Sequence, residues 1–195
     1  MALQCGEELH LEGIANDTGI KAKTISNYIE ILEDTLLGFE VPAFQKTKKR
    51  KAIARSKFYL FDVGVVGFLC GRTIESKKSE LFGKALEIFI AQELRAYLSY
   101  FHSDKKQKIP LQYWRSVSKQ EVDFVLGSEI AIEVKATSRA TDHDLKGLLA
   151  LQEENLCKKF FLVSMDEFER TKNGIQFLHI SSFLKKLWAG EICTP

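Results

Sequence analysis

Apolar residues recur at helical spacing between Leu9 and Leu37, and the pattern is interrupted at Gly19. Glycine readily takes the left-handed backbone conformation that ends a helix, so this stretch predicts a helix, a tight turn and a second helix. The residues expected to face inward on the second helix are Ile25, Tyr28, Ile29, Leu32 and Leu36. The arrangement is typical of a helix-turn-helix, whose second helix would present polar residues near its start.

Two short strands are expected next, at residues 39–44 and 57–61, on either side of the basic run 46–51. A β-hairpin with a basic tip is consistent with the wing of a winged helix. Residues 1–72 are therefore predicted to form an N-terminal winged helix-turn-helix domain with its connecting segment. The polar stretch 73–79 marks the expected domain boundary.

From residue 81 a long apolar helix is followed by alternating strands and helices. Helices are expected at residues 81–101, 142–155 and 182–188, and strands at 111–116, 121–126, 130–136, 159–164 and 175–179. The order αβββαβ predicts an α/β domain over residues 81–195, with a mixed central sheet flanked by helices.

The turn at Gly127 sets the expected register of the two strands around it. A three-residue loop pairs Leu126 with Ile130, and side chains then alternate between the two faces of the sheet. Strict alternation places Val122 and Phe124 together on an apolar face. Any slip by one residue would mix this apolar set with charged residues, so the hydrophobic pattern itself selects the register.

The other face of the same hairpin carries charge. The register places Asp123 opposite Glu133 and Glu121 opposite Lys135. Adjacent carboxylates repel each other unless a proton or a cation lies between them, and Mg²⁺ or Mn²⁺ prefers carboxylate and water oxygens. Such an ion acidifies a bound water and offsets charge on a scissile phosphate. Lys135 would orient that water or stabilise the transition state.

Glu87 is a further acidic candidate. It shares its side of the long helix with small and apolar residues that should face the sheet, and a half-buried acid needs a partner. The pattern predicts a catalytic site of Glu87, Asp123, Glu133 and Lys135, in which the three acids bind the metal. The alternative is a solvated ladder of ion pairs without metal, and for any one of these residues alone that alternative is the stronger.

Overall charge does not indicate a partner. The 28 basic and 26 acidic residues give a formal net charge of +2, so an expectation of DNA binding depends on local clusters. The candidates for DNA binding are Lys21, Lys23, Ser26, Asn27, Lys48, Lys49 and Arg50, with Arg55 and Lys57 as further phosphate contacts. Acidic residues follow on the same helix, so a packing role for the winged helix is equally open.

Cysteine usage and hydropathy concern location. The four cysteines lie far apart, with no Cys-x-x-Cys motif, and no apolar run approaches the roughly 20 residues of a membrane span. We therefore expect a cytoplasmic protein with no membrane partner.

The hairpin residues resemble a known signature. Asp123, within Glu-Val-Asp-Phe-Val-Leu, and the acid-x-Lys tripeptide at residues 133–135 are similar to the PD-(D/E)XK signature of restriction-endonuclease-like nucleases. Glu87 resembles the acidic residue that many of these nucleases supply from their first core helix. Val122 stands where the signature has proline, which leaves the metal ligands unaffected. The resemblance implies a restriction-endonuclease-like fold and magnesium-dependent cleavage of DNA.

A broader resemblance covers nearly the whole chain. Residues 24–33, 57–64, 82–87 and 121–124 are similar, in order and spacing, to the C-terminal region of predicted AAA-type ATPases of bacteria and archaea. In those proteins an ATPase module precedes a winged helix and a nuclease-like domain, yet no Gly-x-x-x-x-Gly-Lys phosphate loop occurs in this sequence. The resemblance implies a C-terminal fragment whose ATP and ATPase module belong to a missing N-terminal half.

Three functions are open at this stage. The chain is a Mg²⁺- or Mn²⁺-dependent deoxyribonuclease that relies on its ATPase, a non-catalytic module that binds DNA or a protein, or a winged-helix transcriptional regulator that needs no metal. The substrate, cleavage itself and assembly into a homo-oligomer are not determined by the sequence.

Overall fold

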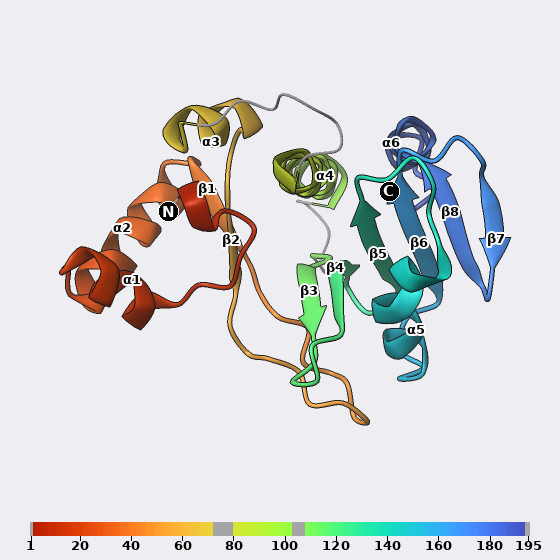
Figure 1. Ribbon diagram of the computed structural model, residues 1–195, viewed down its shortest axis with the longest axis horizontal. Coiled ribbons are helices and arrows are strands. Elements are labelled where there is room, and N and C mark those ends of the chain that lie inside the picture. The colour runs from red at the N-terminus through yellow and green to blue at the C-terminus, as the bar shows by residue number, and fades with distance from the viewer. Residues whose placement is uncertain (1, 72–79, 103–107, 194–195) are drawn as a thin grey trace.

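The computed structural model describes residues 2–71, 80–102 and 108–193. They form a mixed α/β fold in which helices flank a six-stranded mixed sheet, with a two-stranded sheet to one side (Figure 1). The helices are η1 (Ala2–Gln4), α1 (Leu11–Thr18), α2 (Ala22–Asp34), α3 (Val63–Leu69), α4 (Glu80–His102), η2 (Asp142–Leu145), α5 (Lys146–Gln152) and α6 (Ile180–Trp188). The strands are β1 (Gly38–Val41), β2 (Lys57–Leu60), β3 (Leu111–Arg115), β4 (Glu121–Leu126), β5 (Ile130–Lys135), β6 (Lys159–Ser164), β7 (Arg170–Lys172) and β8 (Ile175–His179).

Helices α1 and α2 form the predicted helix-turn-helix. Gly19 has a φ of 71°, and its N–H bonds back to the last turn of α1, so a left-handed residue ends this helix. Ile25 and Ile29 are buried as predicted. Tyr28 and Leu36, also expected inside, are 55% and 67% exposed. Tyr28 lies on the flank of a narrow buried stripe, and Leu36 lies beyond the end of α2, where helical spacing no longer applies.

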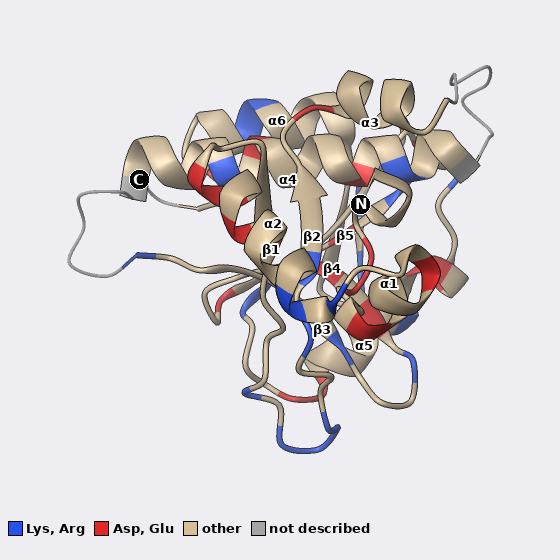
Figure 2. Cartoon of the chain, turned by 90° about the vertical axis from the view of Figure 1, so that its left-hand side faces the viewer, with Lys and Arg blue, Asp and Glu red and all other residues tan. Residues whose placement is uncertain are grey.

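Strands β1 and β2 pair antiparallel as predicted, but the segment between them, residues 42–56, does not project as a wing. The N–H of Phe44 donates to Tyr113 O at 2.7 Å, and the N–H of Ile53 donates to Arg115 O at 2.8 Å. The segment therefore runs along β3, the edge strand of the large sheet, and its basic loop forms the lower end of the molecule in Figures 1 and 2. Docking in this way covers an edge that would otherwise expose unpaired backbone groups.

The large sheet has the order β3-β4-β5-β6-β8-β7, in which β5, β6 and β8 run parallel and the other neighbours antiparallel. The succession α4-β3-β4-β5-α5-β6 confirms the predicted order αβββαβ. Helices α4 and α6 pack on one face and α5 on the other (Figure 1). No helix within the described ranges combines the length and apolarity needed to cross a membrane.

One hydrophobic core joins the N-terminal elements to the large sheet. Ile14 and Ile29 of the helix-turn-helix belong to the same buried cluster as Leu94 of α4 and Ile132 of β5. The domain boundary predicted at residues 73–79 lies outside the described residues. Continuity of the core means that the N-terminal unit and the large sheet support each other.

Candidate active site

A register shift in β4 determines where Asp123 lies. Between Val125 and Val122 the β3–β4 register shifts by one residue, so β4 carries an extra residue there. Such a bulge bends the strand and interrupts the alternation of its side chains. Val122 consequently packs with Val125 in the core beneath α5, while Phe124 packs in the core beneath α4. The prediction that Val122 and Phe124 share a face is therefore wrong.

Strands β4 and β5 keep the predicted register only as far as the pair Phe124–Ile132. Beyond this pair the carboxylate of Asp123 enters the ladder, where its Oδ2 accepts the N–H of Val134 at 2.8 Å. A side chain thus takes the place of a backbone partner. The hydrogen bond fixes the position of the Asp123 carboxylate between the two strands.

Glu133 and Lys135 meet on β5. Lys135 Nζ lies 2.5 Å from Glu133 Oε1, so Lys135 contacts Glu133 and not Glu121, the partner that the sequence register predicts. Glu133 is 5% exposed, and its second oxygen, Oε2, is buried without a hydrogen-bond partner among the described residues. An unpaired buried carboxylate oxygen is costly unless a proton or a cation satisfies it.

The two acids on β4 and β5 influence each other electrostatically. Burial and the charge of Glu87 raise the pKa of Asp123 to about 7, against the opposing charges of Lys135 and Lys57. Burial and the charge of Asp123 raise the pKa of Glu133 well above its usual range. Burial alone would lower the pKa of Lys135, but the carboxylates of Glu133 and Asp123 raise it. Lys135 is therefore a cation at neutral pH beside two acids that compete for a proton.

Glu87 reaches toward the N-terminal unit. Its Oε1 accepts hydrogen bonds from the Tyr59 hydroxyl at 2.7 Å and from Lys57 Nζ at 3.1 Å. The same ammonium lies 2.6 Å from Glu121 Oε1, and the Lys57 side chain is only 4% exposed. Lys57, expected at a DNA surface, is instead buried between two carboxylates. Burial lowers its pKa, but the charges around it, including those of Glu87 and Glu121, raise it to a larger extent.

Sequence reasoning did not place Lys57 and Tyr59 in this site. They stand at alternate positions of β2, so both point to the same side of that strand. The sequence does hold one signal, a lysine at the start of an otherwise apolar strand. A lysine buried with such a strand requires a carboxylate partner for its ammonium.

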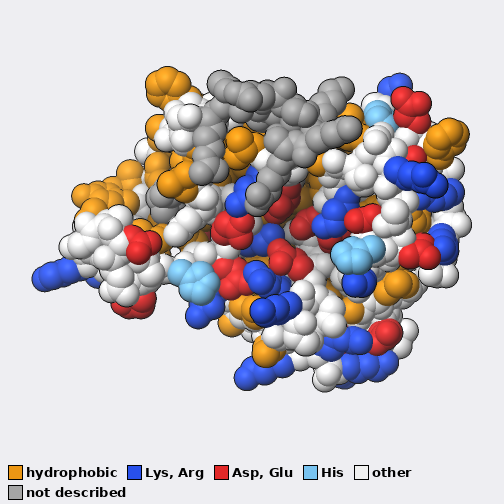
Figure 3. Space-filling view, viewed as in Figure 1, with side chains coloured by type: hydrophobic (Ala, Val, Ile, Leu, Met, Phe, Trp, Pro, Cys, Tyr) orange, Lys and Arg blue, Asp and Glu red, His pale blue; other side chains and the backbone are white. Residues whose placement is uncertain are grey.

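The ion pairs continue beyond Glu121. Its Oε2 lies 3.5 Å from Arg115 Nε, and Arg115 Nη1 lies 2.9 Å from Glu8 Oε1. Figure 3 shows acidic and basic side chains intermixed near the centre of one face of the molecule. These residues form a network of ion pairs that draws on both the N-terminal unit and the large sheet.

The residues expected to contact DNA fall into two groups. At the start of α2, Lys21, Lys23 and Asn27 are exposed, whereas Ser26 is half-buried. These residues occupy the end of the helix that a recognition helix would present to DNA.

The second group lies in the basic loop. The backbone N–H groups of Lys48, Lys49 and Arg50 all donate to the Glu154 carboxylate, at 2.8, 2.9 and 2.9 Å. The guanidinium of Arg50 also lies 2.6 Å from Glu153 Oε2. These hydrogen bonds hold the loop against the C-terminal end of α5, and the carboxylate of Glu153 already compensates the charge of Arg50.

A divalent ion fits part of the predicted set. Asp123 and Glu133 are adjacent buried acids with raised pKa values, and Glu133 Oε2 has no hydrogen-bond partner among the described residues. Glu87 fits less well, because its Oε1 already accepts two hydrogen bonds. Within the described ranges, no three His, Cys, Asp or Glu side chains form a group with the spacing of metal ligands.

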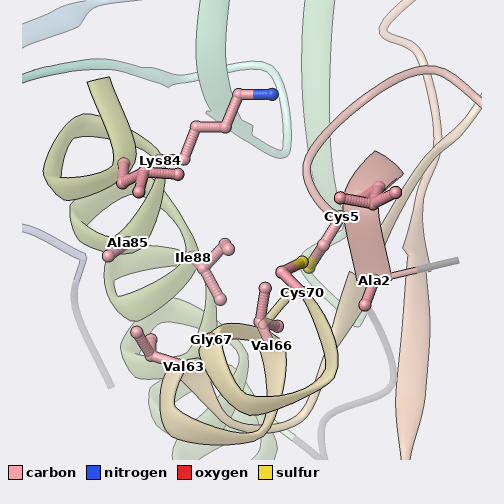
Figure 4. Close-up of a pocket in the computed structure, with 11 residues that line it drawn as sticks. Ala2, Cys5, Val63, Val66, Gly67, Cys70, Lys84, Ala85 and Ile88 are labelled. Carbon is pink, nitrogen blue, oxygen red and sulfur yellow. The ribbon is translucent and has the colours of Figure 1, made fainter. Parts of the chain in front are cut away.

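An apolar cavity of ≈ 210 Å³ lies elsewhere, between η1, α3 and the first turns of α4 (Figure 4). Its lining includes Cys5, Val66, Cys70 and Ile88. None of the acidic candidates lines it, so the cavity is separate from the charged site.

Family models match both parts of the chain. Residues 82–183, just over half of the sequence, match the model described as Domain of unknown function (DUF4143). The chain belongs to this family. Residues 1–76 match a second model, Domain of unknown function (DUF8612). The DUF4143 region contains all four predicted catalytic residues, whereas Lys57 lies in the DUF8612 region. No curated protein and no solved structure matches the chain.

Proposed function

We propose that this protein is a metal-dependent nuclease that hydrolyses phosphodiester bonds in DNA at a site formed by Asp123, Glu133 and Lys135. The observation that carries the proposal is Glu133 Oε2, a buried carboxylate oxygen without a hydrogen-bond partner among the described residues, beside a second acid whose pKa is raised to about 7. Two such carboxylates suit a divalent cation that balances their charge. The element order αβββαβ supports a restriction-endonuclease-like fold as part of the same proposal.

Each residue has a separate task in this proposal. Asp123 and Glu133 would hold Mg²⁺ or Mn²⁺, and the N–H of Val134 keeps Asp123 in position through Oδ2. When bound, the ion supplies an acidified water and positive charge near the scissile phosphate. Lys135, held by Glu133 and charged at neutral pH, donates hydrogen bonds to the attacking water or to a phosphate oxygen.

DNA and an ATPase module are the partners of the proposed nuclease. The exposed Lys21, Lys23 and Asn27 would contact DNA phosphates and groove edges. The resemblance to the C-terminal regions of AAA-type ATPases suggests that an ATPase module, with its ATP, controls access to DNA. Lys48 and Lys49 extend from a loop that is held against α5, so they would add charge without acting as a mobile wing.

Two substitutions test the nuclease. Asp123→Ala should abolish both Mn²⁺ binding and DNA cleavage, because it removes a ligand. Lys135→Ala should retain Mn²⁺ binding within about threefold and lose cleavage at least 100-fold, because a protonated lysine has no lone pair for a metal. Mn²⁺ binding is measured by electron paramagnetic resonance of the free ion. Cleavage is measured on plasmid and single-stranded DNA, with this chain and with a longer protein that carries the ATPase module and ATP.

Lys158→Ala is the matched control. Lys158 makes a 2.8 Å ion pair with Glu129, and both side chains are exposed, so its loss should change neither measurement. Cleavage that survives Lys135→Ala at the wild-type rate would disprove the mechanism.

A non-catalytic module that binds DNA or a protein is the second candidate. It is favoured by the finding that no three metal-ligand side chains group together within the described ranges. On this alternative, the wild-type chain binds no Mn²⁺ and cleaves nothing, even with the ATPase module, while DNA or protein binding persists without metal.

A further inference from the structure

Lys57 is the buried cation at the junction of the two family regions. It comes from β2, whereas its partners Glu87 and Glu121 come from α4 and β4. Its ammonium lies 3.1 Å from Glu87 Oε1 and 2.6 Å from Glu121 Oε1. Tyr59, two residues along the same strand, donates its hydroxyl to the same oxygen of Glu87 at 2.7 Å. One strand of the N-terminal unit therefore supplies both groups that hold Glu87.

This geometry bears on which acids a metal ion could use. A carboxylate oxygen that already accepts hydrogen bonds from an ammonium and a hydroxyl has little capacity left to coordinate a divalent cation. The one buried ammonium also offsets part of the charge of the two carboxylates that share it, which weakens their attraction for a divalent ion. Asp123 accepts a backbone N–H in place of an ammonium, and Glu133, although Lys135 holds its Oε1, keeps a buried Oε2 with no hydrogen-bond partner among the described residues.

We propose that Lys57 is a built-in counter-cation that keeps Glu87 and Glu121 from binding metal. It is a positioning residue, since it acts through these carboxylates. The DUF8612 region would thereby set the charge of a site that lies in the DUF4143 region. The inference rests on the proposed function only for the place of the wild-type ion at Asp123 and Glu133. The role of Lys57 beside Glu87 stands on its own contacts.

Counting bound Mn²⁺ tests this role without any assay of cleavage. Lys57→Met keeps the length and the apolar stem of the side chain but removes its charge, so Glu87 would lose its ammonium partner and Glu121 would keep, among the described residues, only Arg115, at 3.5 Å. We expect the variant to bind one Mn²⁺ per chain more than the wild type does under the same conditions. Lys57→Arg retains a cation and should show the wild-type number.

A double variant identifies the ligand of the extra ion. Lys57→Met combined with Glu87→Gln should return to the wild-type number, because the amide removes the charge that attracts the ion. Mn²⁺ should also raise the melting temperature of Lys57→Met more than that of the wild type, because a ligand that binds only the folded state stabilises it. Lys158→Met, which breaks an exposed ion pair of similar length, is the control and should change neither measurement.

Two results would overturn the proposal. The first is a folded Lys57→Met variant that binds no additional Mn²⁺. The second comes from Glu87→Gln in the wild-type background, which does not depend on how the lysine variant folds. If Glu87 is not a ligand, this variant should bind Mn²⁺ within about threefold of the wild type, whereas Asp123→Asn should lose at least tenfold. Equal losses would make Glu87 a ligand. A wild-type chain that binds no Mn²⁺ would end the proposed function, while the difference between Lys57→Met and the wild type would still decide the role of Lys57.

Discussion

Two features of the Asp123 side chain, its hydrogen bond and its burial, affect stability in opposite directions. Its Oδ2 accepts the N–H of Val134, and this hydrogen bond bridges β4 and β5. Its burial and the charge of Glu87 raise its pKa from 3.8 to about 7. A carboxyl group with a higher pKa in the folded state binds its proton more tightly there than in the unfolded chain. Its contribution to stability is therefore undiminished below pH 3.8, decreases as the pH rises toward 7, and changes little above that.

Replacing Asp123 with asparagine should remove this pH dependence. The amide oxygen can still accept the N–H of Val134, but it carries no charge. Since one pKa unit corresponds to about 1.4 kcal/mol, we expect Asp123→Asn to be more stable than the wild type by up to roughly 4 kcal/mol above pH 7, and by little below pH 4. Urea unfolding between pH 4 and 8 without divalent ions measures the difference. A wild-type stability that increases between pH 4 and 7, with no change in the gap to the variant, would refute this account.

The residues of the candidate site were predictable to the extent that they lie close together in sequence. Asp123, Glu133 and Lys135 flank a single turn, so pairing of the two strands brings them near each other even though the predicted register ends at Phe124–Ile132. Lys57 lies 30 residues from Glu87 in another part of the chain, and no periodicity within either segment indicates that they meet. The contact arises from tertiary packing, which local patterns do not specify.

At the scale of elements, the missed and misplaced features have identifiable physical causes. Helix α3 lies in the connecting segment of the N-terminal domain and is not predicted, because its glycines and valines disfavour helix, yet Asp62 starts it by accepting the N–H of Val65 at 2.8 Å. Strand β7 pairs with β8 around Asn173 and Gly174, whose φ values of 53° and 75° suit a tight hairpin turn. Both signals were present in the sequence. The bulge in β4 was not foreseeable, because no glycine or proline marks it.

Helix α5 approaches β4 closely at Gly147. A Cβ atom there would lie 1.7 Å from the carbonyl oxygen of Glu121, so Gly147→Ala must displace either the helix or the strand. We expect a loss of about 1 to 3 kcal/mol in the free energy of unfolding, as for other overpacked cores. Gly13→Ala in α1 is the matched control, since its Cβ would meet only an ordinary contact at 3.5 Å, and it should stabilise by up to about 1 kcal/mol. Equal effects of the two substitutions in urea unfolding would contradict the close approach.

At the scale of the whole molecule, two regions that match separate family models are joined by three kinds of contact. They share one hydrophobic core, residues 42–56 run along β3, and Lys57 lies between carboxylates of the large sheet. The N-terminal helices therefore share their packing with the large sheet. Strand β2 links the N-terminal unit to these carboxylates, because it carries Lys57.

This joining predicts that the two regions unfold together, and Glu154 offers a way to test it. Its side chain is 1% exposed and accepts three backbone N–H groups of residues 48–50. Since a buried group left without its partner costs about 1 to 3 kcal/mol, Glu154→Ala should destabilise the protein by roughly 2 to 4 kcal/mol. Glu129→Ala, which breaks only an exposed ion pair, should stay within about 0.5 kcal/mol of the wild type.

Hydrogen exchange in increasing urea should show the amides of α2 and β5 losing protection at the same denaturant concentration. Glu154→Ala should lower this concentration equally for both elements. If α2 instead lost protection well before β5 in the wild type, the shared core would not couple the regions, and Lys57 could leave the site without global unfolding.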